Sequence, residues 1–126
     1  MAKKAAKKSK SEPVEMYVDV QGYNVAQVFA DRNTKEPVAL IRLLRKAKKE
    51  VLDVGYVLFF PDGAKLPADS VHNIGTKEEA ILMHAHTIDY ERILDIVRNE
   101  EPVRLYFTGK DAHEGIAEIR SQRENF

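Results

Sequence analysis

The amino-acid sequence predicts an α+β fold of the ferredoxin-like, or split βαβ, class, in which a four-stranded antiparallel sheet carries two helices on one face. Segments with strand-like and helix-like patterns follow one another in the order strand, helix, strand, strand, helix, strand. The length of 126 residues suits a single hydrophobic core. Hydrophobic residues make up 44% of the chain and charged residues 32%, as is usual for a globular protein. An additional helix is expected at the C-terminus.

Composition divides the chain at Pro13 into a basic tail, residues 1–12, and a single α+β domain, residues 13–126. The first ten residues contain five lysines and no acidic residue. The tail has no aromatic or branched apolar side chain, so it cannot bury enough surface to offset the entropy lost on ordering, and we expect it to be disordered. The 116 residues after the first ten carry 15 basic and 20 acidic side chains, which gives them a net charge of −5.

The first strand is predicted at residues 14–21, where apolar and polar residues alternate as they do on a half-buried strand. Residues 22–34 admit two interpretations. Asn24 could cap a short helix, because apolar residues follow it at helical spacing. The segment could equally be a second strand that returns from a turn at Gly22.

The first helix is predicted at residues 37–52, where Pro37 suits a first helical turn and apolar residues recur at helical spacing. Its buried stripe would consist of Leu40, Ile41, Leu44, Ala47 and Val51. Four basic residues at positions i, i+3, i+4 and i+7 would form one basic face: Arg42, Arg45, Lys46 and Lys49. This face could bind phosphates. Alternatively, its charges complement those of the second helix, which contains five acidic residues.

Two strands are predicted in the middle of the chain, on either side of a long connection. Residues 53–60 form an apolar run that ends in three turn-forming residues, Pro61, Asp62 and Gly63. Residues 78–88 are apolar and lack a helical period, which favours a strand.

The last part of the chain is predicted to contain a helix at residues 89–101, a strand at 102–109 and a C-terminal helix at 110–125. Asp89 is the expected cap of the first of these helices. Its apolar stripe would consist of Tyr90, Ile93, Leu94 and Val97. Two acidic residues in capping-box spacing favour the C-terminal helix, whereas Gly115 disfavours it.

Two histidines in the strand at residues 78–88 are the candidate metal ligands. Residues two apart on a strand share a face, so His84 and His86 should point the same way, away from the helices. Imidazole is the commonest metal ligand in proteins, and Asp19 of the first strand is the best third ligand. The run from His84 to Glu91 also reads H-x-H-x4-E and resembles a fragment of the metal-binding motif of cupins, without the flanking glycines of that motif.

The sheet face opposite the helices is the predicted surface for a ligand or partner. Strand alternation would place these residues on it: Tyr17, Asp19, Tyr56, His84, His86, Arg104 and Tyr106. Aromatic side chains on an open sheet could stack bases. Residues 54–60, VGYVLFF, resemble the aromatic RNP1 motif of RRM domains, but without its leading basic residue. The same face could instead be covered by a second subunit.

Several classes of protein are disfavoured by what the sequence lacks. The absence of cysteine excludes disulfides, zinc–thiolate sites and thiol catalysis. The chain has no P-loop, no G-x-S-x-G and no H-E-x-x-H motif, so catalysis is not favoured and no cofactor is indicated. No apolar run approaches the roughly 20 residues that span a bilayer, and no signal-peptide core follows the N-terminal lysines. We therefore expect a cytoplasmic protein that does not bind membranes.

The leading functional hypothesis is a small, non-catalytic binding module that acts through the open sheet face and the lysine-rich tail. A basic arm of this kind often binds nucleic acid, although the ligand of the module could instead be a protein. One alternative is a small metal-dependent or histidine-dependent enzyme that uses His84 and His86. Another is a structural homodimer that assembles through the same sheet face.

Overall fold

The computed structural model describes residues 12–27, 37–100 and 102–121, and these ranges are mostly β-structure. They contain eight strands: β1 (Val14–Val20), β2 (Gly22–Gln27), β3 (Ala39–Ala47), β4 (Glu50–Phe60), β5 (Ser70–His72), β6 (Ala80–His86), β7 (Val103–Asp111) and β8 (Glu114–Ser121). A 3₁₀ helix, η1 (Thr87–Asp89), leads into the one α-helix of the described ranges, α2 (Tyr90–Asn99). The predicted ferredoxin-like fold is wrong, because the strands form two sheets and the second large helix is missing from these ranges.

The eight strands form two sheets that are joined at a corner one residue long. The three-stranded sheet has the order β1-β7-β8, and the five-stranded sheet has the order β2-β3-β4-β6-β5. Neighbouring strands are antiparallel except β4 and β6, which are parallel. Gln21 alone separates β1 from β2, so the chain passes at this residue from one sheet into the other.

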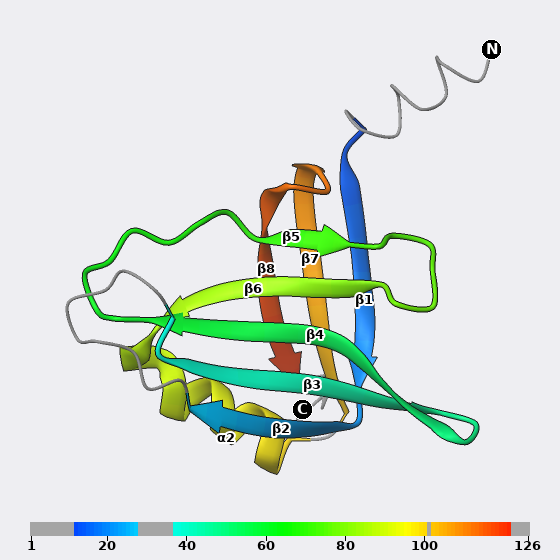
Figure 1. Ribbon diagram of the computed structural model, residues 1–126, viewed down its shortest axis with the longest axis horizontal. Helices are drawn as coiled ribbons and strands as arrows, with labels where there is room; N and C mark the ends of the chain where they lie inside the picture. The colour runs from blue at the N-terminus through cyan, green and yellow to red at the C-terminus, as the bar shows by residue number, and fades with distance from the viewer. Residues whose placement is uncertain (1–11, 28–36, 101, 122–126) are drawn as a thin grey trace, which may run out of the picture.

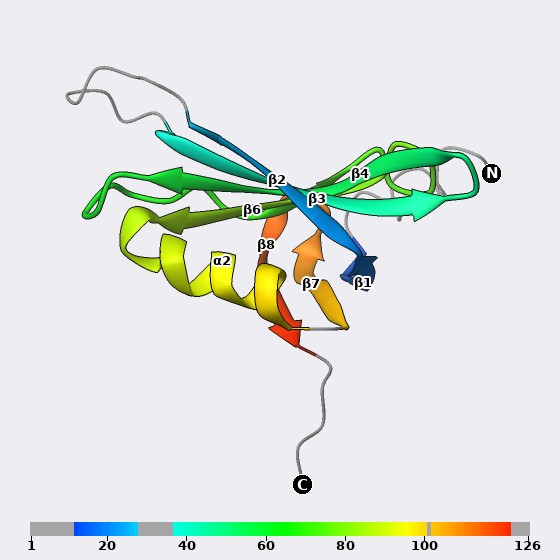
Figure 2. The ribbon, with the colours of Figure 1, turned by 90° about the horizontal axis from the view of Figure 1, so that it is seen from below.

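The two sheets pack face to face with their strands crossed. The five-stranded sheet runs across the view of Figure 1, and the three-stranded sheet crosses behind it. Figure 2 shows that α2 and the three-stranded sheet lie on the same side of the five-stranded sheet. Crossed packing of this kind is one of the two common arrangements of stacked sheets. Each sheet therefore has an inner face toward the core and an outer face that points away from it.

The hydrophobic core lies between the inner faces of the two sheets and under α2. Its largest fully buried side chains are Phe59, Phe107, Ile41, Leu43, Ile81, Leu105 and Val57. Ile93 adds the buried contact of α2. The sheets approach most closely at Gly55 of β4, where a Cβ atom would overlap the side chain of Leu105 on β7. Glycine at this position thus allows the two sheets to cross in contact.

Most of the strands predicted from apolar patterns are confirmed. The strands β1 and β6 fall within predicted strand segments, whereas β4 begins at Glu50, earlier than the predicted strand at 53–60, and β7 ends at Asp111, later than the predicted strand at 102–109. The helix at residues 89–101 is also confirmed as α2, and its predicted apolar stripe packs against the core. Asp89 occupies the position before α2, but its side chain makes no capping hydrogen bond.

The helix predicted at residues 37–52 is wrong, because this segment forms the hairpin of β3 and the start of β4. Burial along β3 follows a period of two, with Ala39, Ile41 and Leu43 on the inner face. A short run of apolar residues fits the helical and the strand period almost equally well. The turn of the hairpin lies at Lys48, which adopts a positive φ of 56°. Hairpin turns usually contain glycine or asparagine, so nothing in this sequence marks the turn.

The C-terminal helix predicted at residues 110–125 is also wrong over its described part. Strand β8 pairs with β7 in an antiparallel hairpin. A Cβ atom at Gly115 would come within 2.5 Å of the ring of Phe107, so glycine is required for the close pairing of the two strands. Gly115, which disfavoured the predicted helix, is thus explained by its role in a strand.

Two further predictions concern segments that the structure describes only in part. For residues 22–34, the strand interpretation is right as far as Gln27, and residues 28–36 lie outside the described ranges. The basic tail also lies outside them, apart from Glu12. Within the described residues, no helix is both long enough and apolar enough to cross a membrane.

Adjacent leucines of β3 test the strand assignment. Leu43→Ala should lower the free energy of unfolding by about 2–5 kcal/mol, because Leu43 is fully buried on the inner face. Leu44→Ala removes the same atoms but should cost less than about 1.5 kcal/mol, because Leu44 is half-buried on the outer face. Urea unfolding followed by circular dichroism measures both values. A larger cost for Leu44 than for Leu43 would contradict this orientation of β3.

Candidate functional site

The structure divides the predicted binding face between two surfaces that belong to different sheets. Four of the predicted residues lie on the outer face of the three-stranded sheet: Tyr17, Asp19, Arg104 and Tyr106. The other three lie on the outer face of the five-stranded sheet: Tyr56, His84 and His86. The two outer faces point away from the core on opposite sides of the molecule, so the seven residues do not form one site (Figure 2).

The outer face of the three-stranded sheet carries a cluster that we call the tyrosine–arginine face. It consists of Tyr17, Asp19, Arg104, Tyr106, Glu118 and Arg120. Strand pairing assembles it, because Tyr17 lies opposite Tyr106 across β1 and β7, and Arg104 lies opposite Arg120 across β7 and β8. The residues between them on β7, such as Leu105, fill the core, so alternation turns the cluster outward.

The two rings and the two guanidinium groups of this face are in contact. The ring centroids of Tyr17 and Tyr106 are 5.6 Å apart, with their planes inclined by 42°. The Cζ atom of Arg104 lies 4.2 Å from the centroid of Tyr17, and that of Arg120 lies 4.7 Å from the centroid of Tyr106. Each exposed cation–π contact contributes about 0.5–1 kcal/mol, so the rings are held in place before any ligand arrives.

Each arginine of the tyrosine–arginine face is also held by a carboxylate. Arg104 Nε donates to Asp19 Oδ1 at 2.9 Å, and Arg120 Nε donates to Glu118 Oε2 at 2.8 Å. The hydrogen bond that Arg104 donates to Asp19 raises the pKa of Arg104 above its ordinary value. Both guanidinium groups are therefore fixed in position while part of each remains open to solvent.

This face also leaves apolar surface exposed. Tyr17 is 49% exposed, and Ile116, which neighbours the cluster on β8, is 68% exposed. Ile116 was not predicted as a site residue, because it belongs to the segment that was assigned to a helix. Tyr17 on β1 and Ile116 on β8 thus leave apolar surface open on both edge strands of this sheet.

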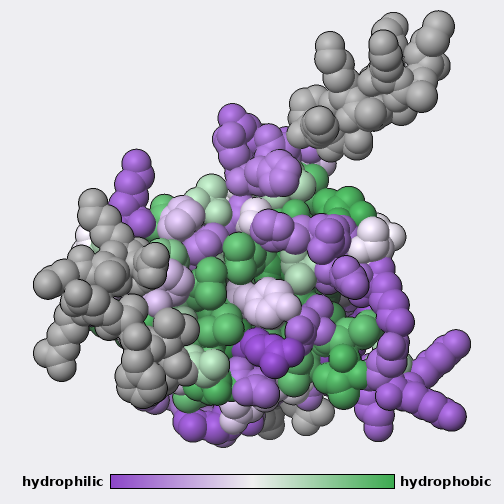
Figure 3. Space-filling view, viewed as in Figure 1, coloured by the Kyte–Doolittle hydropathy of each residue, from purple (hydrophilic) through white to green (hydrophobic). Residues whose placement is uncertain are grey.

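The outer face of the five-stranded sheet is more aliphatic, and we call it the leucine face. Its half-buried leucines are Leu40, Leu44, Leu58 and Leu82. Figure 3 views this side of the molecule and shows hydrophobic side chains across its middle, interrupted by hydrophilic ones. A sheet face of this composition could be covered by a partner, and the rings of Phe60 and His84, which are in contact on this face, are both buried.

The polar side chains within the leucine face bind one another. Arg42 Nη2 donates to both carboxylate oxygens of Asp53, at 2.8 and 2.9 Å, and the Tyr56 hydroxyl donates to Asp53 Oδ2 at 3.0 Å. Burial, followed by the hydrogen bond to Asp53, raises the pKa of Tyr56. The same carboxylate raises the pKa of Arg42. Arg42 is thus paired within the protein, although its side chain is 40% exposed.

The four residues of the predicted basic face are spread along a hairpin. Arg42 lies in the leucine face, Arg45 and Lys46 lie near the end of β3, and Lys49 lies in the turn. They do not share one helical face, because the segment is not a helix. Phosphate binding by this group remains a prediction.

The two histidines lie on the same face of β6, and each is held by the connection between β4 and β5, so that the side chain of His84 is only 6% exposed. His84 Nδ1 lies 3.0 Å from Asp69 Oδ1, and the backbone N–H of His84 donates to the same oxygen at 2.7 Å. His86 Nε2 lies 2.6 Å from the carbonyl oxygen of Ala64. The ring of Phe60 adjoins that of His84, with centroids 5.7 Å apart.

The predicted metal site of His84, His86 and Asp19 is not brought together. That prediction required the first strand to lie in the same sheet as the histidines, whereas β1 pairs with β7 in the other sheet. Asp19 is instead bonded to Arg104. Among the residues that the structure describes, no three histidine, aspartate or glutamate side chains are grouped to hold an ion.

Asp69 is the buried acidic residue that sequence reasoning missed. Besides His84, its carboxylate accepts a hydrogen bond from the backbone N–H of Ala117 at 2.7 Å. Its own backbone exchanges two hydrogen bonds of 3.1 Å with Gly115 on β8. Asp69 therefore links β6 of one sheet to β8 of the other. No local pattern could have indicated this, because its partners lie 15 to 48 residues away in the sequence.

Ser70 and His72 form the one serine–histidine contact of the described residues. On β5, Ser70 Oγ lies 3.0 Å from His72 Nε2. Activation of a serine nucleophile generally also needs a third group that orients the imidazole. Within the described ranges, the second ring nitrogen of His72 makes no hydrogen bond, so the pair falls short of a triad.

In comparisons with known proteins, no family model, no curated protein and no solved structure gives a significant match to this chain.

Substitution of Asp69 tests its role in joining the sheets. Asp69→Ala should lower the free energy of unfolding by about 3 kcal/mol or more, because three donors lose their acceptor and each buried unsatisfied group costs about 1–3 kcal/mol. Asp95→Ala removes an exposed carboxylate from α2 and serves as the control, with an expected cost below about 1 kcal/mol. Equal costs in denaturant unfolding would show that the sheets are joined by other contacts.

Proposed function

We propose that this protein is a non-catalytic binding module that holds single-stranded nucleic acid on its tyrosine–arginine face. The observation that carries the proposal is the contact pair of Tyr17 and Tyr106 on an outer sheet face, flanked by two fixed guanidinium groups. Proteins that bind single strands combine aromatic side chains, on which bases stack, with basic groups that follow the backbone. Base stacking of this kind contributes about 1–3 kcal/mol per base.

The geometry favours a single strand over a duplex. A guanidinium group covers one face of each tyrosine ring, so a base would stack on the part of Tyr17 that stays exposed, and only an unpaired base can offer its own flat face for such a contact. Duplex recognition instead requires a helix or a ribbon that enters a groove. The tyrosine–arginine face is formed by a broad sheet, which suits the first kind of ligand.

The lysine-rich N-terminal segment supplies the positive charge that this face lacks. The face contains two arginines against Asp19 and Glu118, so these four charges cancel. The five lysines of the first ten residues precede β1, the strand that carries Tyr17. Basic arms bind phosphates without sequence preference, and their contribution falls as salt rises.

The competing hypotheses draw less support from the geometry. An enzyme that uses His84 and His86 would have to bring its substrate to the ring of His84, whose side chain is only 6% exposed and is bonded to Asp69. A homodimer through the leucine face would explain the leucines on that side of the molecule. It would give no role to the exposed Tyr17.

The first test of this function is the removal of one ring. Tyr17→Ala should weaken the binding of a short, unstructured single-stranded oligonucleotide by about fivefold or more, because one stacking partner is lost. Tyr17→Phe should bind like the original protein, since stacking needs the ring and not the hydroxyl. Fluorescence anisotropy at low salt measures these affinities.

Ile88→Ala provides the matched control for this test. Ile88 is an exposed apolar residue of η1 that lies outside the tyrosine–arginine face, so its loss should leave affinity unchanged. The proposal is refuted if the original protein does not bind the oligonucleotide, or if Tyr17→Ala binds it equally well.

The second test concerns the lysines of the N-terminal segment. Replacement of all five by glutamine should make the plot of log affinity against log salt shallower by about 0.7 for each phosphate contact that is lost. Because the length of the chain is kept, charge is separated from other effects of the segment. An unchanged salt dependence would show that these lysines do not bind the strand.

A further inference from the structure

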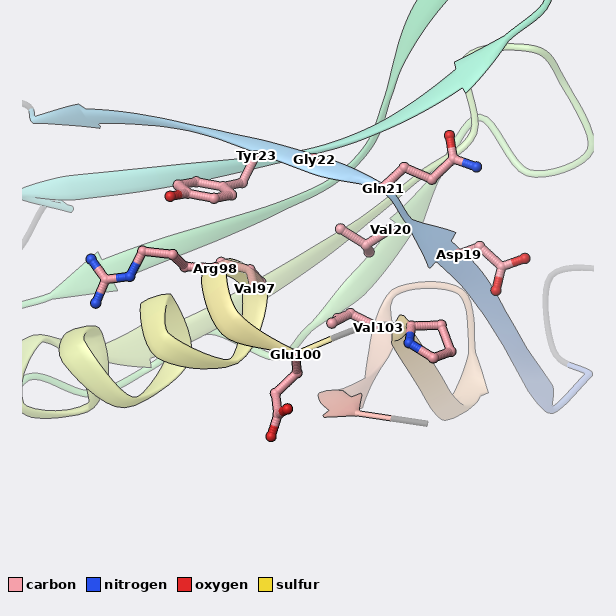
Figure 4. A pocket seen from close by; sticks show the side chains of 10 residues that line it. Asp19, Val20, Gln21, Gly22, Tyr23, Val97, Arg98, Glu100 and Val103 are labelled. Atoms are coloured by element: carbon pink, nitrogen blue, oxygen red, sulfur yellow. The ribbon is translucent and has the colours of Figure 1, made fainter. Parts of the chain in front are cut away.

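A pocket adjoins the tyrosine–arginine face at the corner where the chain passes from β1 into β2. Its volume is about 670 Å³, which is in the range of small-molecule sites. The pocket lies between this corner, the C-terminal end of α2 and the start of β7 (Figure 4). Asp19 belongs both to the pocket and to the tyrosine–arginine face, so the two surfaces are continuous.

The centre of this pocket is apolar and its rim is polar. In Figure 4 the side chains of Val20, Val97 and Val103 gather in the middle. Around them stand five side chains that carry polar groups: Asp19, Gln21, Tyr23, Arg98 and Glu100. An apolar floor with a few polar groups around it suits a flat ring that has hydrogen-bonding groups at its edge.

Several polar groups on the rim have no partner among the residues that the structure describes. The Tyr23 hydroxyl and the Glu100 carboxylate make no hydrogen bond or ion pair with any residue of the described ranges, although both residues are half-buried. Asp19 uses Oδ1 for Arg104, and its other oxygen is not engaged. Arg98, in contrast, is paired with Asp95 at 2.6 Å. The groups that are left for a ligand are therefore mostly acceptors.

We infer that this pocket takes one base of the bound strand and prefers a base with an exocyclic amino group, such as cytosine, over thymine. This inference rests on the proposed function. An ionised carboxylate only accepts hydrogen bonds, so it matches an amino group and repels a carbonyl oxygen. Aspartate and glutamate accept from the amino group of cytosine in known base recognition, whereas thymine offers a carbonyl oxygen at that position.

The path of the strand follows from the position of Arg104. This residue contacts the ring of Tyr17 on one side and is bonded to Asp19, on the edge of the pocket, on the other. A strand with one base stacked at Tyr17 would bring its next phosphate near Arg104 and its next base to the pocket. The tyrosine–arginine face then supplies affinity that does not depend on the base sequence. The pocket supplies the preference for cytosine over thymine.

The test compares deoxycytidine and thymidine oligomers of equal length by fluorescence anisotropy at neutral pH. The protein should bind the cytosine oligomer about fivefold more tightly or better. Glu100→Gln should reduce this preference to less than about twofold, with little change in the affinity for the thymine oligomer. Glu91→Gln, which makes the same change on an exposed part of α2 outside the pocket, should keep the full preference.

A second measurement separates this inference from the proposed function. Free cytidine, added at high concentration, should shift the backbone amide resonances of Gly22 and Tyr23, and free thymidine should not. If cytidine shifts these resonances but neither oligomer binds, the pocket binds the base as inferred and the proposed function is wrong. If both oligomers bind equally well and cytidine shifts nothing, the pocket inference is overturned while the proposed function stands.

Discussion

The carboxylate of Asp69 is the group on which the crossing of the two sheets depends. Strand β5 is only three residues long, and directly before it the side chain of Asp69 takes over as the partner of β6 by accepting the N–H of His84. The same carboxylate accepts from Ala117 on the opposite sheet. Buried donors need acceptors, so this one side chain satisfies the edges of two sheets at once. By holding β8 in place, it also fixes β7 and β1, which carry the tyrosine–arginine face.

Individual strands can be predicted from this sequence more reliably than the way in which they pair into sheets. Alternation along residues 14–21 and the apolar run at 53–60 suffice to identify strands, because burial of one face imposes a period of two. The same reasoning fails for the segment at 37–52. Its leucines and basic residues also fit a helical period, and its turn at Lys48 lacks any usual turn residue. A single missed hairpin then changes the element order, and the wrong fold class follows from it.

The candidate site could be predicted in its parts but not in its grouping. The side chains of Tyr17 and Tyr106 point outward, as alternation predicts, and they meet as expected. Whether Tyr56 and the two histidines join them depends on which strands share a sheet, and that is decided by pairings far apart in the sequence, such as β1 with β7. The pocket at the β1–β2 corner has no sequence signal, because it forms between segments about 80 residues apart.

The one-residue corner at Gln21 determines which surfaces the molecule exposes. Because β1 and β2 belong to crossed sheets, the chain exposes two outer faces that look in opposite directions, one aromatic and one aliphatic. The core separates them, so distant groups on the two faces should contribute to stability or binding independently. A strand held on one side leaves the other side accessible. The architecture thus gives the protein two separate outer surfaces, and a ligand on one of them would not cover the other.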